Sequence, residues 1–112
     1  MQLTYVCAPL AVDIEGNIKR AREYCRQIRD MGGTPVSAHL MFDGVYDDND
    51  PAQRKAALVA GLQILEICDS VIVFGGRISE GMAAEIELAE QIGIQIIYAN
   101  AKLKGQCVGI GA

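Results

Sequence analysis

The segment between Ser70 and Gly81 constrains the fold more than any other part of the sequence. Its first half is the continuously apolar run Val71–Phe74, which is typical of a central strand in a parallel sheet that helices cover on both faces. The glycines after this run break the strand, and Ser79 is a good N-cap for a helix behind it. A buried strand that turns directly into a helix indicates a βα unit, and such units build α/β proteins.

The rest of the chain repeats this alternation of strand and helix. Asp13 is suited to cap one helix, and Asp50 before Pro51 is a strong start signal for another. We predict that the helix from Pro51 runs to about Cys68, and that His39–Asp50 is irregular. Strands alternating with helices imply a parallel sheet with right-handed crossovers. The predicted strands are Leu3–Ala8, Thr34–Ala38, Ser70–Phe74 and Ile94–Tyr98, and the predicted inward leucines of the Pro51 helix are Leu58, Leu62 and Leu65.

Length and composition favour one globular domain. With 112 residues, of which 51% are hydrophobic, the chain can bury one core but not two. We therefore assign residues 1–112 to a single domain and leave the structure of its Gly-rich tail, 105–112, open. The apolar start lacks a basic region and a cleavage site, and no run is long enough to span a bilayer. We expect a cytoplasmic protein that does not bind membranes.

Charge and cysteine content exclude further classes of protein. The net charge of -4 argues against a nucleic-acid-binding protein, because neutralising phosphates needs clustered Lys and Arg. The four cysteines have neither C-x-x-C nor Cys/His spacing, and we interpret them as reduced core residues. An acidic cluster within Asp43–Asp50 does not match an EF-hand loop, and turns and caps explain it more simply. We expect neither a metal nor a cofactor.

Ligands of parallel α/β sheets bind outside the carboxyl ends of the strands. Because carboxyl ends of parallel strands share one edge of the sheet, we expect the segments behind these ends to form one rim. The segments are Pro9–Asp13, His39–Asp48, Gly75–Glu85 and Ala99–Lys102.

The turn from the apolar strand into the next helix has the features of an anion site. Gly75, Gly76 and Gly81 allow a ligand to approach the backbone, and the helix start at Ser79 and Glu80 offers free N–H groups and a favourable dipole. The alternative is an ordinary βα turn with a serine cap. The dinucleotide fingerprint G-x-G-x-x-G is absent from this turn.

Three single residues near this rim are further candidates. Glu85 lies at the edge of an apolar helix face, where a carboxylate can act as a nucleophile or bind a hydroxyl group, or can be a rim residue that the helix dipole stabilises. Tyr5 can turn its hydroxyl into a cleft or pack in the core. His39 can contact a phosphate or sugar, or have a structural role. Residue spacing leaves these alternatives open.

Four segments of the sequence together resemble the nucleoside 2-deoxyribosyltransferase-like superfamily, most closely its small bacterial and phage members. They are Tyr5–Pro9, Ser37–His39, Cys68–Phe74 and Ser79–Ala89, and the last contains the most specific motif, S-x-G-x-x-x-E-x-x-x-A. The resemblance covers nearly the whole chain before the tail. It implies a flavodoxin- or Rossmann-like three-layer sandwich with a parallel sheet of four or five strands. It also implies a cleft for a nucleoside or nucleoside 5′-monophosphate, closed by a neighbouring subunit in a homo-oligomer.

The resemblance also implies roles for individual residues. In catalytic members, a glutamate at the place of Glu85 attacks the anomeric carbon, and a tyrosine matching Tyr5 helps to position that carboxylate. In the branch that cleaves monophosphates, a serine matching Ser79 binds the 5′-phosphate together with the helix N-terminus.

The sequence departs from the catalytic pattern at two places. Gly61 stands where catalytic relatives usually carry an aspartate that protonates the departing base, so that Glu66 or the Asp43–Asp50 loop would have to supply the proton. No arginine lies in Leu10–Asp13, where the family binds phosphate, and Arg77 is the possible substitute.

Two functions therefore stay open. One is an N-glycosidase or deoxyribosyltransferase-like enzyme with Glu85 as its nucleophile. The other is a non-catalytic binder or sequestering protein for a nucleotide or an ADP-ribose-derived signal molecule.

Overall fold

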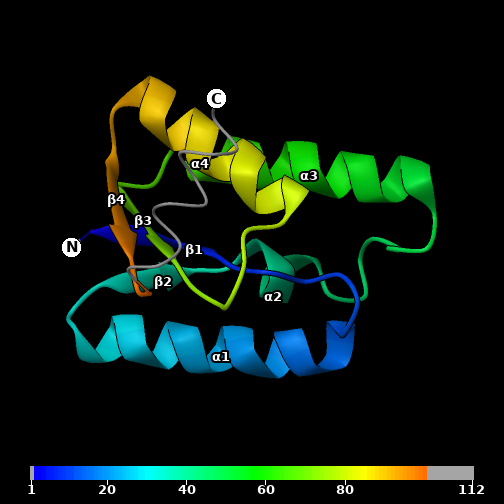
Figure 1. The fold of residues 1–112 in the computed structure, drawn as a ribbon, viewed down its shortest axis with the longest axis horizontal. Coiled ribbons are helices and arrows are strands. Elements are labelled where there is room, and N and C mark those ends of the chain that lie inside the picture. Colours follow the sequence, from blue (N-terminus) through cyan, green and yellow to red (C-terminus); the bar gives the residue numbers. More distant parts are fainter. Residues whose placement is uncertain (1, 101–112) are drawn as a thin grey trace.

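The computed structural model describes residues 2–100, and the tail 105–112 with Cys107 lies outside these residues. Strands and helices alternate along the described part of the chain, apart from two consecutive helices after the second strand (Figure 1). The elements are β1 (Leu3–Cys7), α1 (Ile14–Asp30), β2 (Thr34–Val36), α2 (Ala38–Phe42), α3 (Pro51–Leu65), β3 (Ser70–Val73), α4 (Glu80–Ile92) and β4 (Gln95–Tyr98).

The described strands form one sheet in the order β2-β1-β3-β4, and every neighbouring pair is parallel. In the centre, Tyr5 of β1 lies between Val36 of β2 and Val71 of β3. The predicted α/β fold with a parallel sheet is therefore confirmed, with four strands in the described residues. All four carboxyl ends lie at one edge of this sheet.

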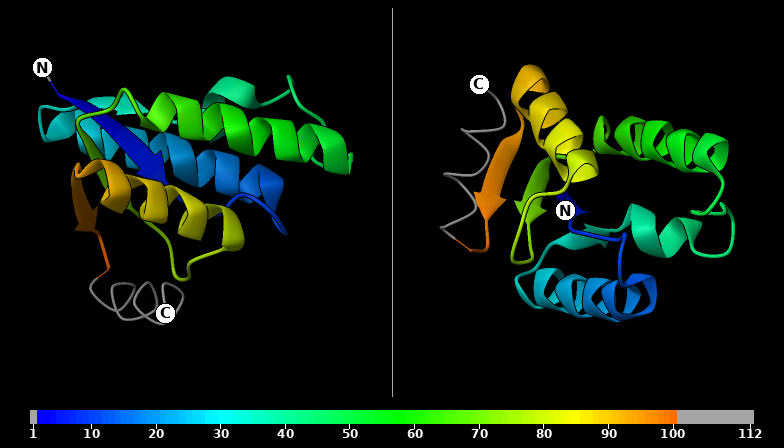
Figure 2. Two further views of the ribbon diagram at one scale, coloured as in Figure 1. Left: turned by 90° about the horizontal axis from the view of Figure 1, so that it is seen from above. Right: turned by 45° about the vertical axis from the view of Figure 1, so that its right-hand side comes forward.

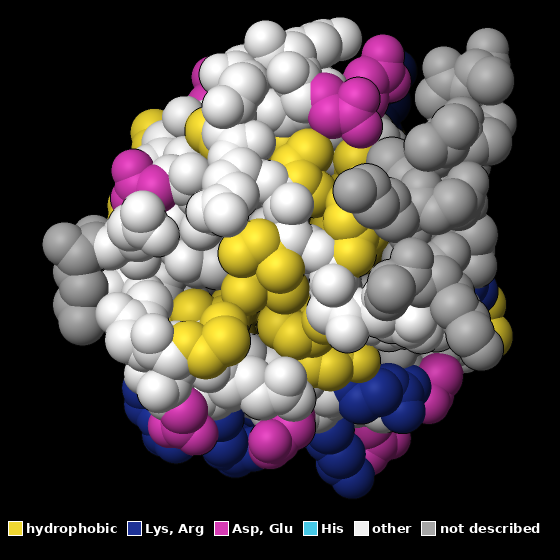
Figure 3. Space-filling model, turned by 60° about the vertical axis from the view of Figure 1, so that its left-hand side comes forward, with side chains coloured by type: hydrophobic (Ala, Val, Ile, Leu, Met, Phe, Trp, Pro, Cys, Tyr) yellow, Lys and Arg dark blue, Asp and Glu magenta, His cyan; other side chains and the backbone are white. Residues whose placement is uncertain are grey.

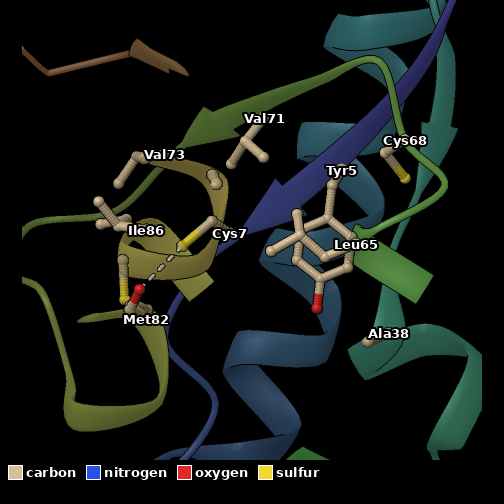
Figure 4. Packing of buried hydrophobic residues seen from close by; sticks show 10 residues of the cluster. Tyr5, Cys7, Ala38, Leu65, Cys68, Val71, Val73, Met82 and Ile86 are labelled. Atoms are coloured by element: carbon tan, nitrogen blue, oxygen red, sulfur yellow. Dashed lines mark hydrogen bonds between the residues drawn. The ribbon is translucent and has the colours of Figure 1, made fainter. Parts of the chain in front are cut away.

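Helices cover both faces of the sheet, which makes three layers (Figure 2). Because side chains alternate along a strand, Val6 and Ile72 pack toward α1 with Ile28, whereas Tyr5 and Val71 pack toward α3 and α4. On the α1 face, the rings of Tyr24 and Phe74 stack with centroids 4.3 Å apart. The other face contains the larger hydrophobic cluster, which Figure 4 shows from close by.

The region after β2 differs from the prediction. The second strand ends at Val36 instead of Ala38, and His39 lies in the short helix α2 instead of an irregular segment. The reason is local: the Ser37 side chain accepts a hydrogen bond of 3.3 Å from the Leu40 N–H, which satisfies a helix N-terminus. A helix of five residues is too short to produce a recognisable periodic pattern.

The long helices begin at the predicted caps. Asp13 accepts from the Gly16 N–H, and Asp50 accepts from the Ala52 N–H at 3.0 Å. However, α3 ends at Leu65 instead of about Cys68. Within α3, Leu65 is fully buried and Leu62 packs against the core, but Leu58 is 37% exposed, so its predicted inward position is wrong. Within the described residues, Cys7, Cys25 and Cys68 are not disulfide-bonded, which agrees with the prediction that they are reduced.

Candidate functional site

Tyr5 and Cys7 lie on the same face of β1, two residues apart. Figure 4 shows the Cys7 side chain pointing toward Met82 of α4 and the Tyr5 ring beside Leu65. Tyr5 is fully buried, among Leu65, Cys68 and Val71 of the larger cluster. Tyr5 is the middle residue of β1, and the Tyr-x-Cys alternation places its side chain on the same face as that of Cys7, the last residue of the strand. The Tyr5 hydroxyl and the Cys7 thiol therefore both contact residues of α4.

α4 begins at the carboxyl edge of the sheet and presents Met82, Glu85, Ile86 and Ala89 as its buried residues. Ser79 caps the helix: its hydroxyl accepts from the Met82 N–H at 3.3 Å. This cap fixes the start of the helix, and the helical repeat then brings Glu85 onto the face that packs against the sheet. Glu85 is only 6% exposed, so it lies within the core instead of at the edge of an apolar face.

The Tyr5 hydroxyl donates a hydrogen bond to Oε2 of Glu85. The Cys7 thiol has two acceptors nearby: the Met82 carbonyl oxygen, 3.8 Å from its sulfur (Figure 4), and the Glu85 carboxyl. Because a thiol has one proton, it donates to one of these acceptors at a time. Tyr5 and Glu85, which are far apart in the sequence, thus form a buried hydrogen-bonded pair with Cys7 beside it.

Burial controls the ionisation of this pair. It raises the pKa of the Glu85 carboxyl from 4.5 to about 7, although the hydrogen bonds from Tyr5 and Cys7 lower it in part. Burial, followed by the charge and hydrogen bond of Glu85, also raises the pKa of Tyr5 above its usual value. Near neutral pH, Glu85 therefore exists in both protonation states, while Tyr5 keeps its proton.

Gly61 of α3 closes the other side of the pair. A Cβ atom at this position would lie 3.2 Å from the Tyr5 hydroxyl oxygen and 3.8 Å from Oε2 of Glu85. The backbone of α3 therefore approaches the pair as closely as a residue without a side chain allows. Gly61 is also the position at which the resemblance leads us to expect an aspartate, and it lies directly beside Tyr5 and Glu85.

The loops after β1 and β3 meet at Gly75 and Pro9. Gly75 has a φ of +100°, and a Cβ atom there would lie 2.8 Å from Cδ of Pro9. Both the left-handed backbone and this close approach require glycine. Contact between the two loops explains Gly75 without a ligand, whereas a Cβ atom at Gly76 would meet open space.

The other residues predicted for the anion site surround the N-terminus of α4. Arg77, Glu80 and Gly76 are exposed, and Ser79 and Gly81 are half-buried. A Cβ atom at Gly81 would meet only Cδ1 of Leu58, at 3.9 Å. Because the Ser79 hydroxyl already caps α4, the ordinary serine-cap interpretation has direct support. A hydroxyl that accepts from the helix can still donate its own proton outward.

His39 joins α2 to the end of β1. Its Nε2 lies 2.6 Å from the carbonyl oxygen of Ala8, and because a carbonyl only accepts, Nε2 carries the proton. Burial lowers the pKa of His39, whereas the Ala8 hydrogen bond and the nearby Asp48 raise it in part. A structural contact of His39 is thus present, and its contact with a ligand stays a prediction.

Glu66 and the Asp43–Asp50 loop, the proposed substitutes for the aspartate that is missing at Gly61, lie at opposite edges of the sheet. Glu66 is exposed and caps the C-terminal end of α3, which leads into the beginning of β3 and so lies at the opposite edge of the sheet. The acidic segment after α2 is at the correct edge, where Asp48 lies near His39. Within residues 2–100, no group of three or more His, Cys, Asp or Glu side chains could hold a metal ion.

Sequence reasoning missed Cys7 as a neighbour of Glu85 and treated it only as a core cysteine. The spacing of two residues between Tyr5 and Cys7 could have revealed this contact, because it places both side chains on one face of β1. The contact of Gly61 with the pair needed the packing of α3 against α4, which no local pattern contains.

Comparison with known proteins places this chain in a family and relates its fold to an enzyme. The family described as "Domain of unknown function (DUF7768)" matches residues 2–99, and the chain belongs to this family. No curated protein matches the chain. Among solved structures, a 2-deoxyribosyltransferase from the psychrotolerant bacterium Bacillus psychrosaccharolyticus is similar, with a TM-score of 0.64 and 17% identity. The similarity covers 86% of this chain and 70% of that protein, and at this identity it shows a distant relationship of fold.

Proposed function

We propose that this protein binds a nucleoside or nucleotide and cleaves its N-glycosidic bond, with Glu85 as the nucleophile. The observation that carries the proposal is the hydrogen bond from Tyr5 to the buried carboxyl of Glu85. This pair lies next to the carboxyl end of a central strand, where parallel α/β sheets bind ligands. The likeness of fold to a 2-deoxyribosyltransferase adds support for a nucleoside as the ligand.

In the proposed reaction, the ionised carboxylate of Glu85 attacks the anomeric carbon and forms a glycosyl ester. Water or a second base then releases the sugar, so that one difficult displacement becomes two easier ones. Tyr5 holds the attacking carboxylate in one orientation through its hydrogen bond. A pKa of about 7 for Glu85 keeps a substantial part of it ionised at neutral pH and preserves its nucleophilicity.

The rest of the proposed site lies on the rim around α4. The N–H groups of Glu80 and Gly81 in the first turn of the helix have no acceptor within the helix, and together with the Ser79 hydroxyl they suit a 5′-phosphate. Arg77 would add a positive charge. The remaining proposed ligand contacts are Gly75, Gly76, Pro9 and His39.

A second candidate function is a non-catalytic nucleotide pocket. The observation that favours it is the 6% exposure of Glu85, because a nucleophile must reach an anomeric carbon. In that case the ligand would bind to the rim around Ser79, and the buried Tyr5–Glu85 pair would hold α4 against β1 without contacting the ligand.

Incubation with a panel of nucleosides, 2′-deoxynucleosides and their 5′-monophosphates, followed by chromatography of released base, tests the proposal. We expect base release by the wild type and its loss in Glu85→Gln, which keeps the shape of the side chain. Glu87→Gln is the matched control, because Glu87 is exposed on the same helix, and it should retain activity. Release that persists in Glu85→Gln would refute the role of Glu85, and tight binding of unchanged ligand would support the non-catalytic pocket.

A further inference from the structure

Glu85 is a buried carboxyl without a cationic partner in the part of the chain that the structure describes. Its pKa is shifted by burial and by hydrogen bonds from two neutral donors, Tyr5 and Cys7, and no Lys, Arg or His contributes. The ion pairs Asp13–Arg20, Glu23–Arg26 and Arg29–Asp30 lie on the exposed surface and do not include Glu85. Because ionised groups in protein interiors are normally paired, the ionised form of Glu85 lacks a balancing positive charge among the described residues, and a cationic ligand would supply one.

Among residues 2–100, the groups that contact the pair also offer no spare proton for a leaving group. α3 faces Tyr5 and Glu85 with Gly61, at which even a Cβ atom would lie 3.2 Å from the Tyr5 hydroxyl oxygen. The proton of Tyr5 is held by Glu85. His39, the single histidine of the sequence, donates its Nε2 proton to the Ala8 carbonyl oxygen. Among the described residues, no second carboxyl or imidazole contributes to the ionisation of Glu85.

This arrangement has a consequence for the base that can depart. A neutral purine or pyrimidine leaves as an anion unless an acid protonates it, and such acid assistance is worth about 10²–10⁴ in rate. A heterocycle that is bonded to the sugar through a quaternary, positively charged nitrogen leaves as a neutral molecule and needs no proton. Its positive charge would also balance the buried carboxylate, which lowers the cost of ionising Glu85.

We infer that the substrates of this protein are N-glycosides with a cationic heterocycle, such as N-ribosyl pyridinium compounds. The inference rests on the proposed function, because it names the substrate class of the same site. The Glu85 carboxylate forms a bond to the anomeric carbon while the bond from that carbon to the pyridinium nitrogen breaks. The bonding electrons go to the nitrogen, which becomes neutral. Water then hydrolyses the glycosyl ester and releases one proton to solvent.

The test compares two ligands that differ in the charge of the leaving group and share the sugar. Nicotinamide riboside carries a pyridinium ring, and its dihydronicotinamide form has nearly the same shape without the charge. Inosine and uridine represent neutral bases. We expect release of nicotinamide from the cationic glycoside at least about 100-fold faster than base release from any neutral one, since acid assistance has about this value. Equal or faster cleavage of inosine or uridine would overturn the inference while leaving the proposed N-glycosidase function intact.

A binding experiment tests the same inference without turnover. Calorimetric titration with 1-methylnicotinamide, a cation, and with neutral nicotinamide should give at least tenfold tighter binding of the cation to the wild type. Glu85→Gln should remove this preference, and Glu87→Gln should keep it. If no N-glycoside is cleaved but the preference for the cation depends on Glu85, the proposed catalysis is wrong and the charge-matched site stands. If the wild type binds both molecules equally, the inference is wrong.

Discussion

Glu85 is the residue whose ionisation couples the candidate site to the stability of the fold. Its pKa is about 7 in the folded protein and 4.5 without the influence of the fold. Between these values the folded protein binds more protons than the unfolded chain, so the free energy of unfolding falls as the pH rises. The stabilising contribution is fully present below about pH 4.5 and is lost above about pH 7. The pKa change corresponds to about 3 kcal/mol.

Glu85→Gln should therefore remove this part of the pH dependence. Urea unfolding at about pH 4 and pH 8 should show a wild type that loses about 3 kcal/mol more than Glu85→Gln over this range. Glu87→Gln should behave like the wild type, because Glu87 is exposed. Parallel pH dependences for the wild type and Glu85→Gln would show that this carboxyl titrates as it does in the unfolded chain.

Cys7 should lower the pKa of Glu85 through its thiol. In Cys7→Ala the ionised carboxylate loses a donor, and we expect the pKa of Glu85 to rise by about one unit, because one hydrogen bond to a charged group is worth about 1.5 kcal/mol. Carbon-13 NMR titration of labelled glutamate measures this pKa directly.

Two variants control this experiment. Cys7→Ser keeps a donor and should leave the pKa of Glu85 at or below its wild-type value. Cys68→Ala removes a thiol that donates to the Ile64 carbonyl at 3.5 Å, and it should leave the titration of Glu85 unchanged. An unchanged pKa in Cys7→Ala would mean that the thiol donates only to Met82.

At the scale of elements, the approach of α3 to the Tyr5–Glu85 pair depends on Gly61. Gly61→Ala gains helix propensity of about 1 kcal/mol, but overpacking against the buried Tyr5 hydroxyl oxygen, 3.2 Å from the new Cβ atom, costs about 1–3 kcal/mol. We expect a net destabilisation of about 1 kcal/mol in thermal or chemical unfolding. Gly81→Ala in α4 is the matched comparison, since its Cβ atom meets only Leu58 at 3.9 Å, and it should be neutral or stabilising. Stabilisation of both variants would contradict the close packing of α3.

The sequence predicted the elements wherever a local interaction determines them. Asp13, Asp50 and Ser79 cap helices through their own side chains, and the apolar run from Val71 is buried between two layers of helices. The short helix α2 was not predictable, because one capping serine and five residues leave no periodic signal. Leu58 fits the apolar pattern of α3 but is 37% exposed, because its burial depends on packing against other elements, which the local pattern does not contain.

For the molecule as a whole, we expect a homo-oligomer. Figure 3 shows an apolar surface above the charged side chains of α1, on the side of the molecule where β4 lies. The outer strand contributes Ile97, which is 41% exposed, and large apolar surfaces of this kind mark interfaces. Sedimentation velocity should therefore show a species of at least twice 12.0 kDa. A single 12.0 kDa species at all concentrations would contradict this expectation. Within residues 2–100, no helix is both long and apolar enough to cross a membrane.

The location of the candidate site could be predicted from the order of elements, because parallel strands place all their carboxyl ends at one edge. The contact between Tyr5 and Glu85 was predicted from the family resemblance alone. Tyr5 lies in β1 and Glu85 in α4, and no local sequence pattern connects these two elements. The burial of Glu85, and with it the raised pKa, required the full packing of α3 and α4. The chemistry of this site therefore depends on the tertiary structure more than on any motif.

Trapping of the glycosyl ester tests the central claim most directly. A fluorine atom at C2′ slows both steps through the oxocarbenium-like transition state, and a good leaving group restores the first step, so the ester accumulates. We predict that incubation with the 2′-deoxy-2′-fluoro analogue of nicotinamide riboside adds the mass of one fluorosugar to the protein, located by peptide mapping on Glu85 and absent in Glu85→Gln. An unmodified protein, or a sugar on any other residue, would contradict the assignment of Glu85 as the nucleophile.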